Sequence, residues 1–213
     1  MKLGVLLPAA LLACSGFGSG RIAGTVDFKG RTLKPQTVKS VEPGCKGALV
    51  PWEPRALVRI SRGAGAGVAP STAVVLEEKG CTFRPWLQGA VRGQKILLRN
   101  ADGTTHSVRA AAGQTTLFHV IQPPRAQDLQ KDLLASDVVK VSCDLHPWMT
   151  AFVVVSAHSY FAVTADDGTY EIKDVPPGAY AVEAWNDRLG VLRAEVVVEE
   201  GQTVDPKFTF TVR

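Results

Sequence analysis

This 213-residue chain has no long run of basic residues and no apolar run of membrane-spanning length. Each absence excludes a class of protein. The formal net charge is +4, and no long basic run concentrates it, so nothing indicates nucleic-acid binding. The apolar run at residues 3–13 is too short to span a bilayer. Glycine and proline are instead plentiful, with 20 and 13 residues, and valine and threonine are common. This composition predicts an all-β chain of short strands, in which the polar stretch 127–134 has room for one helical turn.

The N-terminus has the pattern of a secretory signal peptide. A positive charge precedes the apolar stretch, and a small residue precedes the expected cut. The tetrapeptide Leu11-Leu12-Ala13-Cys14 also resembles a bacterial lipobox, which implies that residues 1–13 are removed and that Cys14 is the lipidated first residue. Ser15 follows rather than Asp, which by this resemblance implies retention at the outer membrane. The alternative is an ordinary signal peptide with an incidental cysteine.

The segment Cys143-Asp144-Leu145-His146-Pro147-Trp148-Met149 holds the densest group of metal-ligand side chains. A thiolate, an imidazole and a thioether lie together there, immediately before the strand-like run 152–155. These are the ligand types of a blue-copper centre, in which one Cys and two His form a plane and a Met binds weakly on the axis. His106, in a turn-rich segment between two apolar runs, is the candidate for the second histidine.

At these residues the chain resembles the cupredoxins. The Cys-x-x-His-x-x-Met spacing, with Pro147 after the histidine and Trp148 before the methionine, is most similar to the amicyanins. The resemblance implies a Greek-key β-sandwich over residues 72–156. It also implies four ligands to one type 1 copper ion, which are His106, Cys143, His146 and Met149. The chain departs from the amicyanin pattern at Thr105, where Pro is usual, and at Ser107, where Asn is usual.

Residues around the ligands are expected to orient them. Asn100 and Ser107 are candidates to tie the turn that carries His106 to the ligand loop, although the two departures loosen this support. Pro147 fixes a backbone dihedral and stiffens the loop.

The ligand loop also suggests how the site is tuned and where electrons leave it. The backbone amide of Asp144, or that of Ser142, is expected to donate to the thiolate sulfur and so tune the potential. Trp148 and Pro147 are expected to form an apolar surface beside His146, where electrons leave.

Export gives meaning to the four cysteines. With Cys14 assigned to lipid and Cys143 to metal, Cys45 and Cys81 remain, and an oxidising compartment favours a disulfide between them. Such a bridge contributes on the order of 4 kcal/mol in the chain-entropy model. The rival pairing, of Cys143 with either of the two, would remove the copper site.

Residues 158–213 follow a second pattern. Residues 161–172 have the pattern of a strand, an Asp-Gly turn and a strand, and 175–185 that of a proline turn and a strand. The motif T-x-x-D-G-x-x-x-I-x-x-V-P-P-G-x-Y resembles the carboxypeptidase regulatory-like family, a transthyretin or carbohydrate-binding-like β-sandwich. That family opens with a G-x-V strand, found here at Gly24-Thr25-Val26. We therefore predict that residues 21–62 and 158–213 form one sandwich with the cupredoxin inserted. The alternative is two consecutive domains.

Together these patterns favour an electron carrier over an enzyme. The chain would be held by lipid and a flexible tether, residues 14–20, at a bacterial membrane, on its periplasmic or surface face. There it would exchange single electrons with a redox partner protein. Of four histidines, the copper site uses two, so a trinuclear cluster cannot be built. His119 and His158 are expected to be structural.

Two other functions remain open at this point. The chain could be a surface module that grips a glycan or a protein partner, with a vestigial cupredoxin. It could also handle copper as a storage protein or chaperone. A Met-rich Cu(I) site is disfavoured, because one of the two methionines is the initiator.

Overall fold

The chain folds into an all-β structure, which confirms the predicted class. The computed structural model shows strands throughout, with one short 3-10 turn, η1 (Pro43–Cys45), among the residues it describes. No helix in this part of the chain has the length and apolarity needed to cross a membrane. The predicted leader, Cys14 and the start of the tether lie outside the described residues, which are 18–30, 36–40, 42–50, 54–134 and 137–212.

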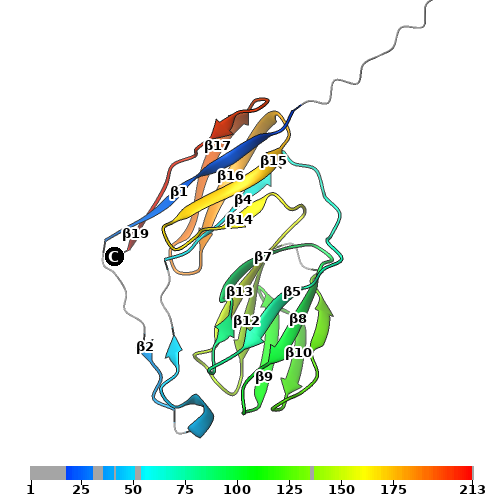
Figure 1. Ribbon diagram of the computed structural model, residues 1–213, viewed down its shortest axis with the longest axis vertical. Helices are drawn as coiled ribbons and strands as arrows, with labels where there is room; N and C mark the ends of the chain where they lie inside the picture. Colours follow the sequence, from blue (N-terminus) through cyan, green and yellow to red (C-terminus); the bar gives the residue numbers. More distant parts are fainter. Residues whose placement is uncertain (1–17, 31–35, 41, 51–53, 135–136, 213) are drawn as a thin grey trace, which may run out of the picture.

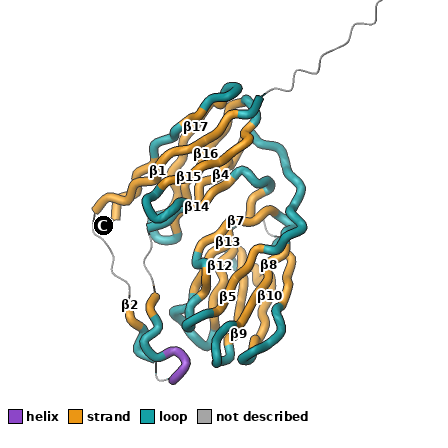
Figure 2. Tube along the Cα trace, viewed as in Figure 1, coloured by secondary structure: helices purple, strands orange, loops and turns teal. Residues whose placement is uncertain are grey.

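Two β-sandwich bodies make up the fold (Figure 1, Figure 2). The first, which we call the composite sandwich, has one sheet of order β15-β1-β18, with β19 also paired to β1, and a second sheet of order β14-β4-β16-β17. The strands of the first sheet are β1 (Gly20–Gly30), β15 (Thr169–Val175), β18 (Thr203–Val204) and β19 (Phe208–Val212). Those of the second are β4 (Leu57–Arg62), β14 (Phe161–Val163), β16 (Gly178–Asn186) and β17 (Gly190–Val198).

Strands β1 and β4 belong to sheets whose other members all come from the C-terminal part of the chain. β1 runs antiparallel to β15 and parallel to β18 and β19, and β4 lies between β14 and β16. Ile22 of β1 and Ile60 of β4 are buried in one core with Phe208. The second body therefore lies, in sequence, between two parts of the composite sandwich.

The second body, which we call the second sandwich, has sheets of order β10-β9-β12-β13-β7 and β11-β8-β5-β6. The strands of the first sheet are β7 (Leu87–Val91), β9 (His106–Ala112), β10 (Thr115–Gln122), β12 (Val138–Cys143) and β13 (Thr150–Ser156). Those of the second are β5 (Val74–Glu78), β6 (Phe83–Arg84), β8 (Lys95–Asn100) and β11 (Leu129–Asp132). The expected helical turn at residues 127–134 is wrong, because β11 pairs there with β8.

Alternation along the strands fills the second core and directs polar groups into it. Side chains of a strand point alternately to its two faces. The inward series of β12 passes through Val141 and ends at Cys143, and that of β8 passes through Leu98 and ends at Asn100. Each fully buried aliphatic side chain contributes about 1.5–3 kcal/mol. The hydrophobic core thus holds in place the strand ends that carry the thiol and the amide.

A short arm, residues 36–50, leaves the composite sandwich and extends alongside the second sandwich (Figure 1). It contains β2 (Gln36–Thr37), η1 and β3 (Leu49–Val50), with β2 antiparallel to β3. A disulfide joins Cys45 of the arm to Cys81 of the second sandwich, with Cα atoms 5.3 Å apart. The predicted disulfide is confirmed, and Cys143 remains a free, buried thiol.

One carboxyl group lies inside the second sandwich without a partner. Glu78, at the end of β5, is 0% exposed, and neither of its carboxylate oxygens has a hydrogen-bond partner within the described part of the chain. Burial, helped by the negative charge of Asp102, raises the pKa of Glu78 to about 8. The side chain is therefore neutral in the folded protein at pH values where it is ionised in the unfolded chain.

This group makes stability depend on pH. The folded protein binds the Glu78 proton more tightly than the unfolded chain does. The contribution of this proton to the free energy of unfolding is therefore fully present below the unfolded pKa. It is lost as pH rises through the folded pKa, about 8. We expect Glu78→Gln to remove this loss, making the variant more stable than the wild type by roughly 2–4 kcal/mol at about pH 9 and nearly equal at about pH 4. Urea unfolding at both pH values measures the difference. Glu77→Gln, on the same strand, is the control, and an unchanged pH slope in Glu78→Gln would contradict the assignment.

Candidate metal centre

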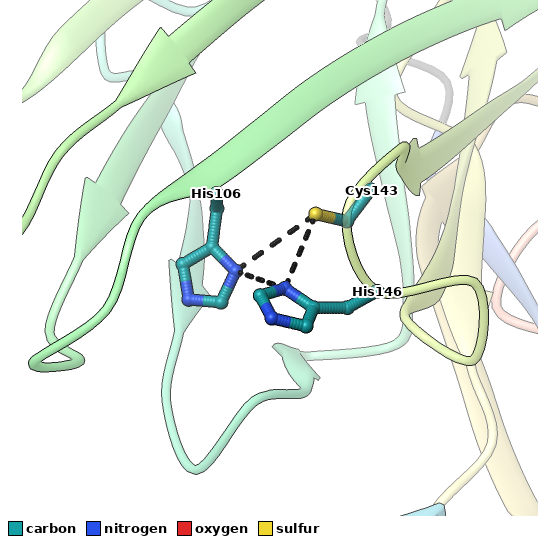
Figure 3. A group of neighbouring side chains, drawn as sticks. All are labelled: His106, Cys143 and His146. Atoms are coloured by element: carbon teal, nitrogen blue, oxygen red, sulfur yellow. Dashed lines mark hydrogen bonds between the residues drawn. The ribbon is translucent and has the colours of Figure 1, made fainter. Parts of the chain in front are cut away.

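Three metal-ligand side chains converge at one end of the second sandwich (Figure 3). His106 begins β9, Cys143 ends β12 and His146 lies in the loop that leads to β13. The two Nδ1 atoms are 3.1 Å apart, and the Cys143 Sγ lies 3.5 Å from Nδ1 of His146 and 3.9 Å from Nδ1 of His106. All three residues are at most 3% exposed.

These separations suit donor atoms that share one metal ion. Bonds of about 2.0–2.3 Å at trigonal angles place the donors about 3.5–3.7 Å apart, close to the spacing seen here. One sulfur and two imidazole nitrogens are the planar donor set of a blue-copper centre. The residues present therefore fit a copper ion.

Met149, the predicted axial ligand, belongs to the same tight loop. Its amide donates to the His146 carbonyl at 2.9 Å, and its carbonyl accepts from the Cys143 amide at 3.2 Å. The residue is 1% exposed. These bonds fix the loop that carries three of the four predicted ligands.

The hydrogen-bond donor to the sulfur is Ser107, not Asp144 or Ser142 as predicted. The Ser107 amide lies 3.4 Å from the Cys143 Sγ. The Asp144 amide donates instead to the Ser107 carbonyl at 2.9 Å, because the antiparallel contact between β9 and β12 continues past Cys143. Ser107 thus supports the site through its backbone amide, which is the same whether the side chain is Ser or the Asn that is usual in the amicyanin pattern.

Asn100 holds the turn that leads to His106. Its Nδ2 donates to the carbonyls of Thr104, Gln122 and Pro123 at 2.8, 2.9 and 3.1 Å, and its Oδ1 accepts from the Asp102 amide at 2.9 Å. The predicted role as a support is seen, but these bonds tie the turn to the end of β10 and not to the ligand loop.

A carboxylate contacts the far nitrogen of each imidazole. Asp102 Oδ2 lies 3.0 Å from Nε2 of His106, and Glu42 Oε2 lies 2.7 Å from Nε2 of His146. Outer carboxylates of this kind fix the tautomer of a metal-binding histidine and raise its basicity. Each Nδ1 is thereby left free to bind a metal. Burial is the main cause that lowers the pKa of His106. The lower pKa favours the neutral imidazole that a metal requires.

Neither carboxylate was identified from the sequence. Asp102 precedes His106 by four residues in the Asn-Ala-Asp-Gly turn, so its position was a usable signal. Glu42 lies far away in the sequence, on the arm. The Cys45–Cys81 disulfide joins the arm to the second sandwich, and the second oxygen of Glu42 accepts from the Thr104 hydroxyl.

The surroundings of His146, where the electron exit is expected, are closed to solvent. His146 is only 2% exposed, because the arm covers it. Its Nε2 lies against Glu42 and 3.5 Å from the Cys45 Sγ. Pro147 is exposed and Trp148 half-buried, with the indole Nε1 donating to the Cys81 carbonyl at 3.0 Å. The Trp148 ring lies 5.2 Å from that of His146, so these two residues border the site as expected, and the electron exit there stays a prediction.

The two remaining histidines lie outside the group of ligands. His119 Nε2 contacts the Ser107 hydroxyl at 2.8 Å and the Asp144 carboxylate at 3.0 Å. His158 Nδ1 contacts the amide of Tyr160 at 3.3 Å, and burial lowers its pKa. Neither joins the three ligands that face one another in Figure 3.

Comparison with known proteins gives partial matches. The family model described as polysaccharide lyase family 4, domain II, matches residues 134–206, and so differs from the carboxypeptidase regulatory-like family that the motif resembles. No curated protein matches.

Similar solved structures include several copper proteins. One is a purple cupredoxin from Nitrosopumilus maritimus, at 17% identity over 39% of this chain and 99% of that one, with a TM-score of 0.35. Another is a methionine-to-alanine variant of amicyanin in the Cu(I) state, at 19% identity over 46% and 98%, with a TM-score of 0.36. A third is the copper-containing nitrite reductase of Thermus scotoductus SA-01, at 16% identity and a TM-score of 0.35, where the match covers 44% of this chain and only 24% of the reductase.

The contact of Glu42 with His146 predicts an effect on metal affinity. We expect Glu42→Gln to weaken copper binding by about 10–100-fold, because the imidazole loses its anionic partner while its ligand nitrogen stays in place. Competition with a copper chelator measures the affinity. Glu195→Gln, which removes an exposed ion pair with Arg62 on the composite sandwich, should leave it unchanged. Equal affinity in both variants would show that Glu42 does not support the site.

Proposed function

We propose that this chain is an exported, lipid-anchored protein that binds one type 1 copper ion and transfers single electrons. The observation that carries the proposal is the buried convergence of His106, Cys143 and His146, with donor atoms 3.1–3.9 Å apart. The Cys-x-x-His-x-x-Met loop supports a cupredoxin of the amicyanin type. The further proposals are Cys14 as the lipid-bearing residue, attachment at the bacterial outer membrane and a protein as redox partner.

The copper ion, when bound, would supply the redox couple that accepts or gives one electron. The residues of the chain supply rigidity. His106 and Cys143 stand at the ends of paired strands, and backbone bonds within the 143–149 loop hold His146. Asp102 and Glu42 fix the two rings. A donor set held this firmly changes little between oxidation states, which favours electron transfer.

Burial gives the site a second property. All three donors in the plane are at most 3% exposed, so water and small molecules are kept from the metal position. A site closed in this way favours electron exchange over turnover of a bound substrate. We propose no catalytic role for this centre.

A second candidate function concerns the composite sandwich. Residues 134–206 match a domain of polysaccharide lyases, and on this ground we propose that the sandwich contacts a glycan. The match also includes β12, the ligand loop and β13 of the second sandwich, so the glycan proposal is made only for its part from β14 onward, which contains none of the copper ligands.

The visible absorption spectrum tests the copper proposal. On addition of Cu(II) to residues 15–213, we expect an intense thiolate-to-copper band that Cys143→Ser abolishes, because the band requires the sulfur ligand. His106→Ala should weaken or shift the band. His119→Asn, which changes a histidine outside the ligand group, should leave it in place.

Two results would sink this proposal. The first is a folded wild-type protein that stays colourless with Cu(II). The second is a visible band that survives in Cys143→Ser.

A further inference from the structure

A cavity of about 290 Å³ lies beside the metal-ligand loop, where the second sandwich faces the composite sandwich. Trp86, Trp148, Met149 and Phe152 line it from the second sandwich. Asp187, in the turn between β16 and β17, lines it from the composite sandwich. None of the three planar donors, His106, Cys143 and His146, lines this cavity.

Aromatic side chains form much of its wall, and two of them are fixed. The Trp148 ring is held by the hydrogen bond from its Nε1 to the Cys81 carbonyl, 3.0 Å long. Phe152 packs edge-on against Trp185, with ring centroids 5.2 Å apart. Such surfaces present flat apolar faces at little entropic cost, and they favour another aromatic ring.

One polar group in the lining lacks a partner. The Oδ1 atom of Asp187 is buried and accepts no hydrogen bond within the described residues, while its Oδ2 faces Arg188 Nε at 3.8 Å. A buried acceptor without a donor is costly and calls for an explanation. The Asp187 side chain as a whole is 17% exposed and lines the cavity, so a hydroxyl group of a bound molecule can donate to the accessible part of this carboxylate.

We propose that this cavity binds a single-ring phenol, with the ring against the aromatic side chains and a hydroxyl donating to Asp187. The volume supports one ring, because pockets for drug-sized ligands begin at about 300 Å³ and this cavity measures about 290 Å³. An oligosaccharide is too large for it. A purely apolar molecule would place no donor against the Asp187 carboxylate.

The inference deepens the proposed function and rests on it in one respect. Met149, the predicted axial ligand, lines the cavity, and the Trp148 ring lies 5.2 Å from that of His146. A bound phenol would therefore lie beside the loop that holds the metal. Binding itself requires no metal, so it can be measured on the metal-free protein.

The experiment titrates hydroquinone into ¹⁵N-labelled, metal-free protein and follows the indole N–H signals of the tryptophans by NMR. We expect the signals of Trp86 and Trp148 to shift in a saturable way, with an affinity in roughly the millimolar range for a ligand of this size. Asp187→Asn should weaken binding by about fivefold or more, because the hydroxyl loses an anionic acceptor. Asp132→Asn is the matched control, since it removes an exposed ion pair with Lys95 outside the cavity.

Three outcomes would overturn the inference. The first is no saturable shift in a protein whose spectrum is that of a folded chain. The second is equal affinity in the wild type and in Asp187→Asn. The third is saturable binding of methyl β-glucoside without binding of hydroquinone, which would make this a sugar site. Hydroquinone binding by a protein that never forms a copper–thiolate band would leave this inference standing and refute only the proposed copper function.

Discussion

Antiparallel pairing of β9 with β12 is the constraint on which the candidate metal centre depends. It sets Cys143 opposite Val108, so that the first residue of β9, His106, lies near the last residue of β12. The same pairing directs the Ser107 amide to the thiol and uses the Asp144 amide elsewhere. A shift of this register by one residue would turn the thiol away from the core and dismantle the site.

The arm supplies the carboxylate that contacts His146. A disulfide holds it on the second sandwich, and Glu42 reaches His146 from there. The contact orients the imidazole and at the same time hides it from solvent. The contact that orients the His146 ring therefore also removes its direct access to the surface.

Much of the fold could be predicted because alternation is a local signal. The all-β composition was visible in the sequence, as was the density of ligand types in residues 143–149. The strand β11 was missed, because its pattern is polar and only pairing with β8 makes it a strand. The Asp187 cavity was missed for a related reason, since its walls come from separate bodies.

By itself the sequence determined the all-β class, the candidate ligand residues and the pair of cysteines that bridge. The class and the candidate ligands follow from residue type and short spacing, which are local properties, and the disulfide pair follows from elimination among the four cysteines. The tertiary structure alone decided which amide faces the sulfur, that Glu42 contacts His146 and that His146 is covered. These depend on contacts such as that between Glu42 and His146, which long loops and a disulfide create and which no local pattern encodes.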